Sequence, residues 1–304
     1  MPPLAFFRSL IERQGPLTLR PAALEDYDAI RDLLDASTRA YSGLGGAMRE
    51  AMQQDVALTA WQQDRLAGFI LAHVQGPAAA WIHGLGLASD VAPDTVGVAL
   101  LHELERSLAE RGVTWIGYMD EYRLGWARRL LERAGYHFHT RVVSYETPLH
   151  TPPTAGNAAV TVRPATAADL PAVAQVDAAA FGPLWAYREQ VLCAVYGEVA
   201  YFEVAEHAGE VVGYILCTVY QRDRVHIVRL AVAPHAQRQG VGARLLAEAY
   251  DDFARQDIRW VTLNTQEENV RSQRLYQRFG FQATGEEMDV WGKEVPPSGS
   301  PVAG

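Results

Sequence analysis

The feature that most constrains the fold of this chain is an internal repeat, in which one pattern of residues occurs twice. The segment LTLRPAALEDYDAI, which begins at Leu17, matches VTVRPATAADLPAV, which begins at Val160, at an offset of 160 − 17 = 143. Further on, Trp115–Tyr136 matches Trp260–Phe281 at an offset of 260 − 115 = 145. A drift of this size is what loops of different length produce. The repeat therefore predicts two copies of one structural unit.

The chain has 304 residues, which is enough for two domains. A stretch rich in Pro, Gly and Asn separates the copies. We therefore expect a first domain at 1–150, a linker at 151–159 and a second domain at 160–295. The Pro-, Gly- and Ser-rich tail at 296–304 is expected to be disordered.

Each copy shows the same order of strand and helix patterns. In the second copy we expect a first helix that opens at Thr166 or Ala167 and is followed by two further helices. The strands are expected at Val160–Arg163, Val199–Ala205, Val211–Tyr220, Val225–Val232, Ile258–Leu263 and Phe281–Trp291, and the later helices at Gln239–Arg255 and Val270–Phe279. Mixed strands and helices in this order predict an α/β (α+β) sheet domain.

Charge and cysteine content exclude several classes of protein. The formal net charge is −9, so we expect no nucleic-acid partner and no anionic membrane surface. The two cysteines, Cys193 and Cys217, show no disulfide or metal-ligand spacing, and Cys217 ends an apolar run as a small buried hydrophobe. The first fifteen residues lack a signal-peptide cleavage pattern, and no apolar run is long enough to span a membrane. We therefore expect a cytoplasmic protein.

The most informative stretch is LAVAPHAQRQGVGARL, which runs from Leu230 to Leu245. A β-branched strand passes into a polar turn, and the turn passes into a helix with glycines at its entrance. The first N–H groups of a helix have no internal partner and favour negative charge, and glycine lets an anion approach the backbone closely. This stretch predicts a site for a diphosphate, with Arg238 and Arg244 adding positive charge at its rim.

The string Gln237-x-x-Gly240-x-Gly242, preceded by Leu-Ala-Val-x-Pro, resembles the acyl-CoA signature of the GNAT superfamily of acetyl-CoA-dependent N-acetyltransferases. The resemblance implies two tandem GNAT-like domains, each a mixed, mostly antiparallel twisted sheet flanked by helices. It implies acetyl-CoA as co-substrate and no metal. A bulge at about Leu230–Val232 would part this strand from the next one and admit the pantetheine arm. The implied cofactor-binding residues are Leu230, Ala231, Val232, Gln237, Arg238, Gln239, Gly240, Val241, Gly242, Ala243, Asn269 and Tyr276.

A second string also resembles this family, with Asn269 opening a helix that carries Ser272 and Leu275-Tyr276 and ends in Gly-Phe. On its own, Asn269 is a preferred helix cap, and the resemblance adds a hydrogen bond to CoA. Tyr276 follows Asn269 by about two helical turns. We expect its hydroxyl to act as the general acid that protonates the departing thiolate, the alternative being a ring that packs in the core.

The general base is less clearly marked. The strand before the cradle, Val225–Leu230, holds no carboxylate, which leaves His226 as the candidate. By the repeat register, His83 occupies the matching position in the first copy, which favours a shared structural role instead. Glu203 and Glu267 are weaker candidates, since exposed glutamates are usually only solvated.

The first copy has lost these features. By the repeat register, Asp94 replaces Gln237, Gly97 matches Gly240 and Ala99 matches Gly242. Two acidic residues, Asp90 and Asp94, thus flank the place where a diphosphate would lie. Leu124 stands at the position of Asn269, and Leu131 at that of Tyr276. We therefore expect a degenerate first domain and a catalytic second one.

These features predict direct acetyl transfer to a primary amine of a small molecule or a peptide, by a monomer or a homodimer. The tandem layout is similar to that of mycothiol synthase, and the second copy also resembles enzymes that acetylate protein N-termini, so the acceptor stays open. The resemblance places the acceptor pocket at the first-helix region Phe181–Arg188. The alternative class is a CoA-binding regulatory or scaffold protein without turnover.

Overall fold

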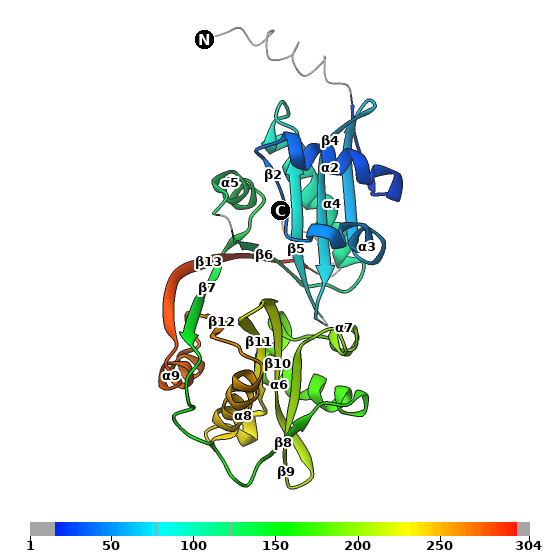
Figure 1. Ribbon diagram of the computed structural model, residues 1–304. Coiled ribbons are helices and arrows are strands. Elements are labelled where there is room, and N and C mark those ends of the chain that lie inside the picture. The colour runs from blue at the N-terminus through cyan, green and yellow to red at the C-terminus, as the bar shows by residue number, and fades with distance from the viewer. Residues whose placement is uncertain (1–15, 77, 122, 297–304) are drawn as a thin grey trace. The chain divides into compact units, whose positions relative to one another are not determined.

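The computed structural model describes residues 16–76, 78–121 and 123–296. The chain divides into two compact units (Figure 1). Unit 1 comprises residues 1–74, 78–139 and 290–304, and unit 2 comprises residues 75–77 and 140–289. The N-terminal segment at 1–15 and residues 297–304 of the expected disordered tail lie outside the described residues.

The two halves of the sequence form corresponding series of elements. In the first half these are β1 (Leu17–Pro21), η1 (Leu24–Asp26), α2 (Tyr27–Ala36), β2 (Ala40–Ser42), η2 (Gly45–Ala47), α3 (Met48–Gln54), β3 (Val56–Gln62), β4 (Arg65–Val74), β5 (Ala79–Leu87), α4 (Pro93–Ala109), β6 (Trp115–Asp120), α5 (Gly125–Arg133) and β7 (His137–Pro148). In the second half they are β8 (Thr161–Pro164), η3 (Ala167–Asp169), α6 (Leu170–Trp185), α7 (Glu189–Val195), β9 (Tyr201–His207), β10 (Glu210–Gln221), β11 (Arg224–Val232), η4 (Pro234–Ala236), α8 (Val241–Arg255), β12 (Trp260–Gln266), α9 (Val270–Arg278) and β13 (Gln282–Glu294).

Each unit is built on a mixed sheet. The strand order is β1-β3-β4-β5-β6-β13 in unit 1 and β7-β12-β11-β10-β9-β8 in unit 2. The strands β5 and β6 pair in parallel, as do β11 and β12. The antiparallel pairs include β1–β3, β3–β4, β4–β5, β8–β9, β9–β10, β10–β11 and β7–β12. This confirms the predicted α/β class with a mostly antiparallel sheet flanked by helices.

The helices cover their sheets with amphipathic faces. In unit 2, α8 buries Val241, Leu245, Ala249 and Phe253, which recur every four residues and so lie on one side of the helix. They pack in one core with residues of β10 and β12, whereas α6 packs in a separate core with Tyr214, Leu216 and Ala231. Fully buried Cys217 belongs to the α8 core, which confirms its predicted role as a small hydrophobe.

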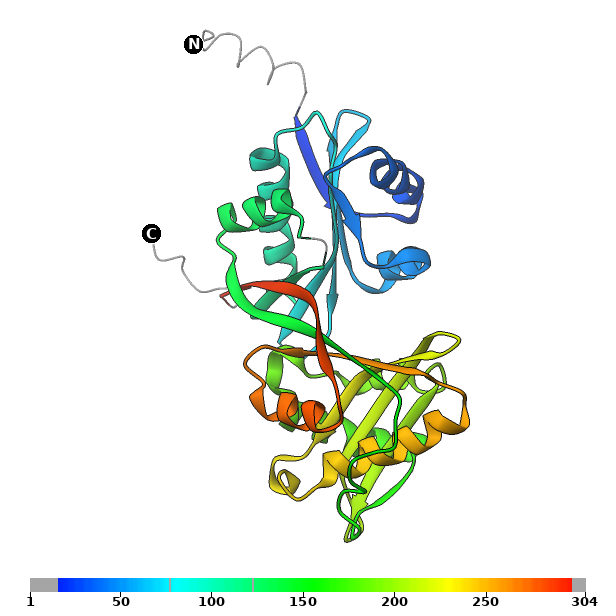
Figure 2. The same cartoon turned by 60° about the vertical axis from the view of Figure 1, so that its left-hand side comes forward.

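The last strand of each sequence copy belongs partly to the other unit, and Figure 2 shows both strands, β7 in green and β13 in red. Residues 140–148 of β7 lie in unit 2, where β7 pairs with β12 from Val142↔Gln266 to Pro148↔Trp260. The end of β13 lies in unit 1, where Trp291 is buried in the core and Lys293 contacts Glu105 at 2.8 Å. The units therefore do not coincide with the ranges 1–150 and 160–295.

Element boundaries follow local backbone conformation. The helix expected from Gln239 begins at Val241, because Arg238 and Gly240 take positive φ values of 64° and 80° that no helix continues through. Thr166 and Asp169 form a capping box before α6, as expected at that position. The helix α7 was not predicted. In the part of the chain that is described, no helix has the length and apolarity to cross a membrane.

Candidate active site

The candidate site in unit 2 begins where two parallel strands part. β11 pairs with β12 over four rungs only, from Arg224↔Trp260 to Ile227↔Leu263. On its other edge, β11 changes register against β10 between Arg229↔Leu216 and Ile227↔Cys217, so Val228 is an extra, bulged residue. The bulge was expected at Leu230–Val232 and instead lies at Val228, immediately after the last paired rung. It bends β11 away and leaves the later residues of β11 unpaired with β12.

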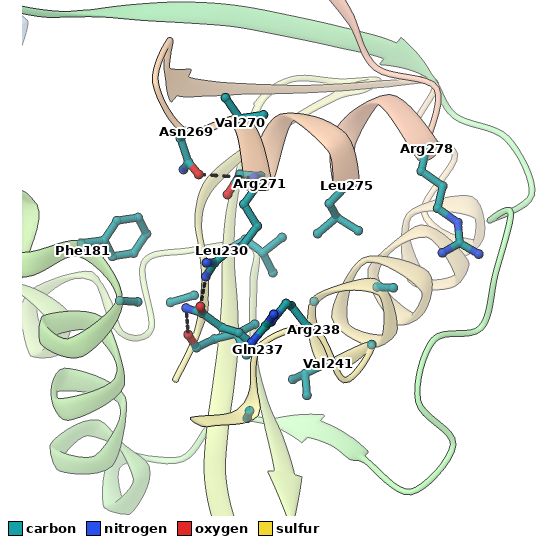
Figure 3. A pocket seen from close by; sticks show the side chains of 18 of the residues that line it. Phe181, Leu230, Gln237, Arg238, Val241, Asn269, Val270, Arg271, Leu275 and Arg278 are labelled. Atoms are coloured by element: carbon teal, nitrogen blue, oxygen red, sulfur yellow. Dashed lines mark hydrogen bonds between the residues drawn. The ribbon is translucent and has the colours of Figure 1, made fainter. Parts of the chain in front are cut away.

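A cavity of about 540 Å³, here called the cleft cavity, lies beside this opening (Figure 3). It is lined by ten of the residues predicted to bind the cofactor, which are Leu230, Ala231, Val232, Gln237, Arg238, Gly240, Val241, Gly242, Ala243 and Asn269. Gln239 does not line it, because its side chain donates to the His235 carbonyl and its own carbonyl accepts from Asn157. Tyr276 does not line it either.

The cradle at one end of the cleft cavity follows from backbone geometry. The chain turns through η4, and its left-handed residues Arg238 and Gly240 bring it to the start of α8. A Cβ atom on Gly240 would lie 3.2 Å from the Asn157 amide nitrogen. Glycine at this position therefore suits both the left-handed backbone conformation and the close approach of Asn157. The free N–H groups of the first turn of α8 then face the cavity, which Gly242 and Ala243 of this turn line.

The charge of the lining suits an anion. Arg238, Arg271 and Arg278 line the cleft cavity together with one carboxylate, Glu268. In Figure 3, Arg271 reaches from α9 to the side chain of Gln237, to which it donates a hydrogen bond. Gln237 in turn donates to the Val232 carbonyl at 3.0 Å. These contacts link α9, the cradle and the free end of β11 around one space.

Asn269 acts as the helix cap that its position predicted. Its Oδ1 accepts from the Ser272 amide at 3.3 Å, and its Nδ2 donates to Thr265 Oγ1 at 3.1 Å. Asn269, Ser272 and Leu275 recur every three residues and all line the cleft cavity. This spacing was present in the sequence and could have identified Ser272, Leu275 and Arg278 as site residues, together with Arg271.

Tyr276 lies in the core beneath this face of α9. It is 6% exposed, and its ring packs edge-on against Phe281 at 5.7 Å between centroids. Burial raises the pKa of Tyr276 to about 12, while a hydrogen bond with Ser272 opposes the shift. The hydroxyl is thus joined to a residue of the cavity wall, and the phenol remains protonated at neutral pH.

His226 faces a different cavity of about 770 Å³, here called the polar-face cavity. Its floor is a row of paired residues across four strands: Thr218 of β10, His226 of β11, Thr262 of β12 and Glu146 of β7. Residues paired in this way present their side chains on the same face of a sheet. The remaining lining residues are Ser144, Tyr145, Tyr220, Arg224, Leu263, Asn264, Thr284, Glu286 and Met288.

The hydrogen bonds of Thr262 favour one of the two tautomers of a neutral His226. The Thr262 hydroxyl donates to the Val225 carbonyl at 3.3 Å, so it accepts from His226 Nδ1 at 2.9 Å. The Nε2 atom therefore carries the lone pair. Burial lowers the pKa of His226, which favours this neutral form. Such an imidazole is suited to accept a proton one rung from the opening between β11 and β12.

The register of the sheets corrects the match between the two copies. β11 begins to pair at Arg224↔Trp260 and β5 at Ala79↔Trp115, both offset by 145 (224 − 79 and 260 − 115). At this offset His226 corresponds to Trp81, and His83 does not match it. The two copies therefore share no histidine at this position.

The same offset moves the glycines of the first copy. Gly97 packs against Leu130 and Leu87 in the way that Gly242 packs against Leu275 and Val232. Gly97 therefore matches Gly242 and was wrongly matched to Gly240, and Asp94 and Ala99 likewise match Gln239 and Arg244. Asp94 forms an ion pair with Arg133. The matches of Leu124 with Asn269 and of Leu131 with Tyr276 hold at this offset.

A buried ionic cluster that sequence reasoning missed holds the segment Phe181–Arg188. Asp177 of α6 is fully buried and accepts from the Tyr187 amide at 2.6 Å and from the Tyr214 hydroxyl at 2.5 Å. Arg229 lies 3.7 Å from the same carboxylate and stacks on the rings of Tyr187 and Phe181. Because Arg229 directly follows the bulged residue Val228, its side chain lies on the same face of the sheet as Asp177. The cluster fixes the kink that Gly182 makes in α6 with a φ of 71°.

The other candidate bases lie outside both cavities. Glu203 of β9 is half-buried, and burial raises its pKa, but it lines neither space. Glu267 lines neither space either; the cleft cavity has its neighbour Glu268. Within the described ranges, no three His, Cys, Asp or Glu side chains are grouped to hold a metal ion.

Comparisons with known proteins agree with this architecture. A family model described as "Acetyltransferase (GNAT) family" matches residues 172–281. The uncharacterized N-acetyltransferase YhfO of Bacillus subtilis is 31% identical over 125 residues, which cover 35% of this chain and 84% of that protein. The spore coat polysaccharide biosynthesis protein SpsD of the same organism is 39% identical over 87 residues, or 29% of this chain, and the chain spans only 30% of its length.

A solved structure extends the likeness to both halves. The tandem GNAT protein from the clavulanic acid biosynthesis pathway aligns with a TM-score of 0.59 and 15% identity, over 93% of this chain and 100% of that one. At this identity the likeness shows the fold, which is a tandem arrangement in both proteins.

Proposed function

Since the chain belongs to the GNAT family of N-acetyltransferases, we propose that unit 2 transfers an acetyl group from acetyl-CoA to a primary amine of a small molecule or a peptide. One observation carries the proposal: the opening between β11 and β12 has an anion cradle on one side and a polar face with a neutral histidine on the other. In the described part of unit 1, α4 begins at Pro93, over positions equivalent to the cradle, and Trp81 stands where unit 2 has His226.

The residues of the cleft cavity fit acetyl-CoA. Gly240, Val241 and Gly242 would hold the diphosphate with backbone N–H groups, and Arg238 and Arg271 add positive charge. The unpaired edge of β11 at Leu230–Val232 offers backbone groups to the pantetheine amides, as an added strand would use them. When bound, acetyl-CoA supplies an acetyl thioester as the electrophile.

Two side chains would manage the protons. His226 Nε2 accepts a proton from the ammonium group of the acceptor, since only the free amine is nucleophilic. Tyr276 does not line the cleft cavity, so it would protonate the departing sulfur through Ser272 on the cavity wall, to whose side chain its hydroxyl is hydrogen-bonded. No covalent enzyme intermediate is needed, because the amine attacks the thioester directly.

Calorimetric titration of acetyl-CoA into the wild-type protein and into Gly240→Glu tests the cofactor site. We expect micromolar binding of acetyl-CoA at one site per chain of the wild type and no measurable binding to the variant. The glutamate would place a carboxylate in the cradle, and it would force a non-glycine residue into the left-handed conformation of Gly240. Asp257→Gly, which removes a left-handed non-glycine residue at the end of α8, is a control for altered backbone. Two sites would contradict a degenerate unit 1, and no binding would contradict the proposal. Binding without transfer to any amine would favour a CoA-dependent regulatory protein.

A further inference from the structure

The strand that closes the polar-face cavity comes from the first sequence copy. Residues Ser144, Tyr145 and Glu146 of β7 line this cavity, and β7 is the last strand of the degenerate copy. They lie in unit 2 because β7 pairs with β12. The first copy thus supplies one wall of a cavity whose opposite edge carries the proposed base.

The polar-face cavity lies beside the point at which β11 and β12 part. His226 occupies the rung next to Ile227↔Leu263, the last pair before the strands part. An amine at His226 Nε2 is therefore next to the opening into which the thioester would project. The rest of an acceptor bound there extends along the floor, over Thr262 toward Glu146, because these residues form one transverse row.

The charges of this cavity decide what the far end of the acceptor carries. Glu146 and Glu286 line it against one cation, Arg224, while His226 is neutral. Arg224 lies 3.5 Å from Glu146 and is also stacked on the ring of Trp260, so it neutralises one carboxylate only in part. Glu286 lies on β13, the strand beside β7, and is exposed. The lining has an excess of negative charge and favours a cationic ligand.

Resting on the function proposed above, we propose that the preferred acceptors are diamines or polyamines, with one amine at His226 and a second ammonium group at Glu146 and Glu286. Glu146 is a specificity-determining residue that the first copy contributes. Two strand spacings separate β11 from β7, or roughly 9–10 Å. The two amines are thus expected to be separated by a chain of several methylene groups, and short diamines should be poor acceptors.

The test compares diamines with monoamines of equal chain length on the full-length protein. For wild type, we expect kcat/KM for 1,6-diaminohexane to exceed that for hexylamine by about tenfold or more, as expected for a hydrogen bond to a charged group. Glu146→Gln removes the charge of the side chain and keeps its shape. It should lower kcat/KM for 1,6-diaminohexane about tenfold, while kcat/KM for hexylamine and the KM for acetyl-CoA stay within about twofold of wild type. Glu189→Gln, on α7 outside both cavities, is the matched control and should change neither value.

Equal rates for the two amines, or a preference that survives in both Glu146→Gln and Glu286→Gln, would overturn the proposal. Stronger use of acceptors that carry a carboxylate would overturn it in favour of Arg224 as the recognising group. Calorimetry with 1,6-diaminohexane alone separates this proposal from the function. If no amine is acetylated but the diamine binds in a Glu146-dependent manner, the transferase function fails and the cationic site stands. Transfer to monoamines without a diamine preference contradicts only the acceptor class.

Discussion

The two copies open the same pair of strands and use the opening differently. In unit 2, β11 leaves β12 after Ile227↔Leu263, and its free edge borders the cleft cavity. In unit 1, β5 leaves β6 after the equivalent pair, Ile82↔Tyr118, but β2 then pairs with β5 from Ser42↔Gly84 to Ala40↔Gly86. β4 already occupies the other edge of β5 over these residues, so β2 fills the edge that faces the opening.

In unit 1 the chain itself thus takes the place in which unit 2 would receive a pantetheine arm. The Gly43 amide donates to the His83 carbonyl and the Leu87 amide to that of Arg39, so the backbone groups that a cofactor would use are already satisfied. The difference teaches that this opening is a property of the fold, and that it becomes a site only where the chain leaves its edge free.

The two units also differ in the connection that leads from the opened strand to the next helix. Between β5 and α4 the connection spans residues 88–92, whereas between β11 and α8 it spans residues 233–240. At the offset of 145, Val96 corresponds to Val241, so α4 starts a turn earlier at Pro93. The extra helical turn, Pro93–Thr95, replaces the loop residues Arg238–Gly240. Loss of the cradle is therefore a change of backbone as well as of charge.

The largest effect is expected from His226, which stands where unit 1 has Trp81. His226→Gln should lower kcat/KM by about 10²–10⁴-fold, because it removes the general base. Acetyl-CoA affinity should stay within about twofold, because His226 lies outside the cleft cavity. Steady-state kinetics and calorimetry measure the two quantities. Trp81→Phe is the matched change in unit 1 and should leave the rate unchanged.

The pH dependence sharpens the same assignment. His226 acts as a base only when neutral, and burial lowers its pKa from the ordinary 6.5. The acid limb of kcat/KM should therefore lie below pH 6.5, with activity lost as the pH falls through the lowered pKa. An acid limb above pH 6.5, or an unchanged limb in His226→Gln, would exclude His226 as the base.

A smaller effect is expected from Tyr276, which stands where unit 1 has Leu131. Tyr276→Phe should lower kcat by about 10–100-fold at unchanged acetyl-CoA affinity, since it removes the acid and keeps the ring in the core. Because the pKa of Tyr276 is about 12, it should cause no alkaline fall in rate below about pH 11. Tyr250→Phe, which loses a hydrogen bond to the Phe279 carbonyl in the same core, is the control. A rate equal to wild type in Tyr276→Phe would show that Tyr276 only fills the core.

Much of this site could be predicted from local sequence. The glycines of the cradle, the Asn269 cap and the strand before them are fixed by short-range backbone chemistry, and the structure brings them around one cavity. The exchange of β7 and β13 could not be predicted, because alternating hydrophobicity makes a strand suitable for a sheet without saying which sheet. The match of Gly97 with Gly240 was wrong because it used the offset of 143 that holds at the start of the repeat, whereas the offset is already 145 where β4 pairs with β5 and β10 with β11.

The sequence also did not show on which face of the sheet some side chains of β11 lie. His226 and Val228 would lie on one face of a regular strand, but a bulge at Val228 also turns Arg229 to that side, where it meets Asp177. No periodic pattern marks such a bulge. The acidic wall at Glu146 was equally hidden, since its partner residues Thr262 and His226 lie 262 − 146 = 116 and 226 − 146 = 80 positions away in sequence.

The smallest expected effect separates a packed glycine from an open one. A Cβ atom on Gly97 would lie 2.6 Å from a methyl group of Leu130, which is buried in the unit 1 core, so Gly97→Ala should lower the free energy of unfolding by about 1–3 kcal/mol. A Cβ atom on Gly242 would lie 3.1 Å from a methyl group of Leu275, beside the cleft cavity, and at an ordinary contact distance of 3.7 Å from Val232. Gly242→Ala should therefore change unfolding by less than about 1 kcal/mol, because better helix propensity offsets the contact. Urea denaturation measures both changes. Equal destabilisation would mean that the first turn of α8 is as tightly packed as α4, and that the opening of unit 2 is no freer than that of unit 1.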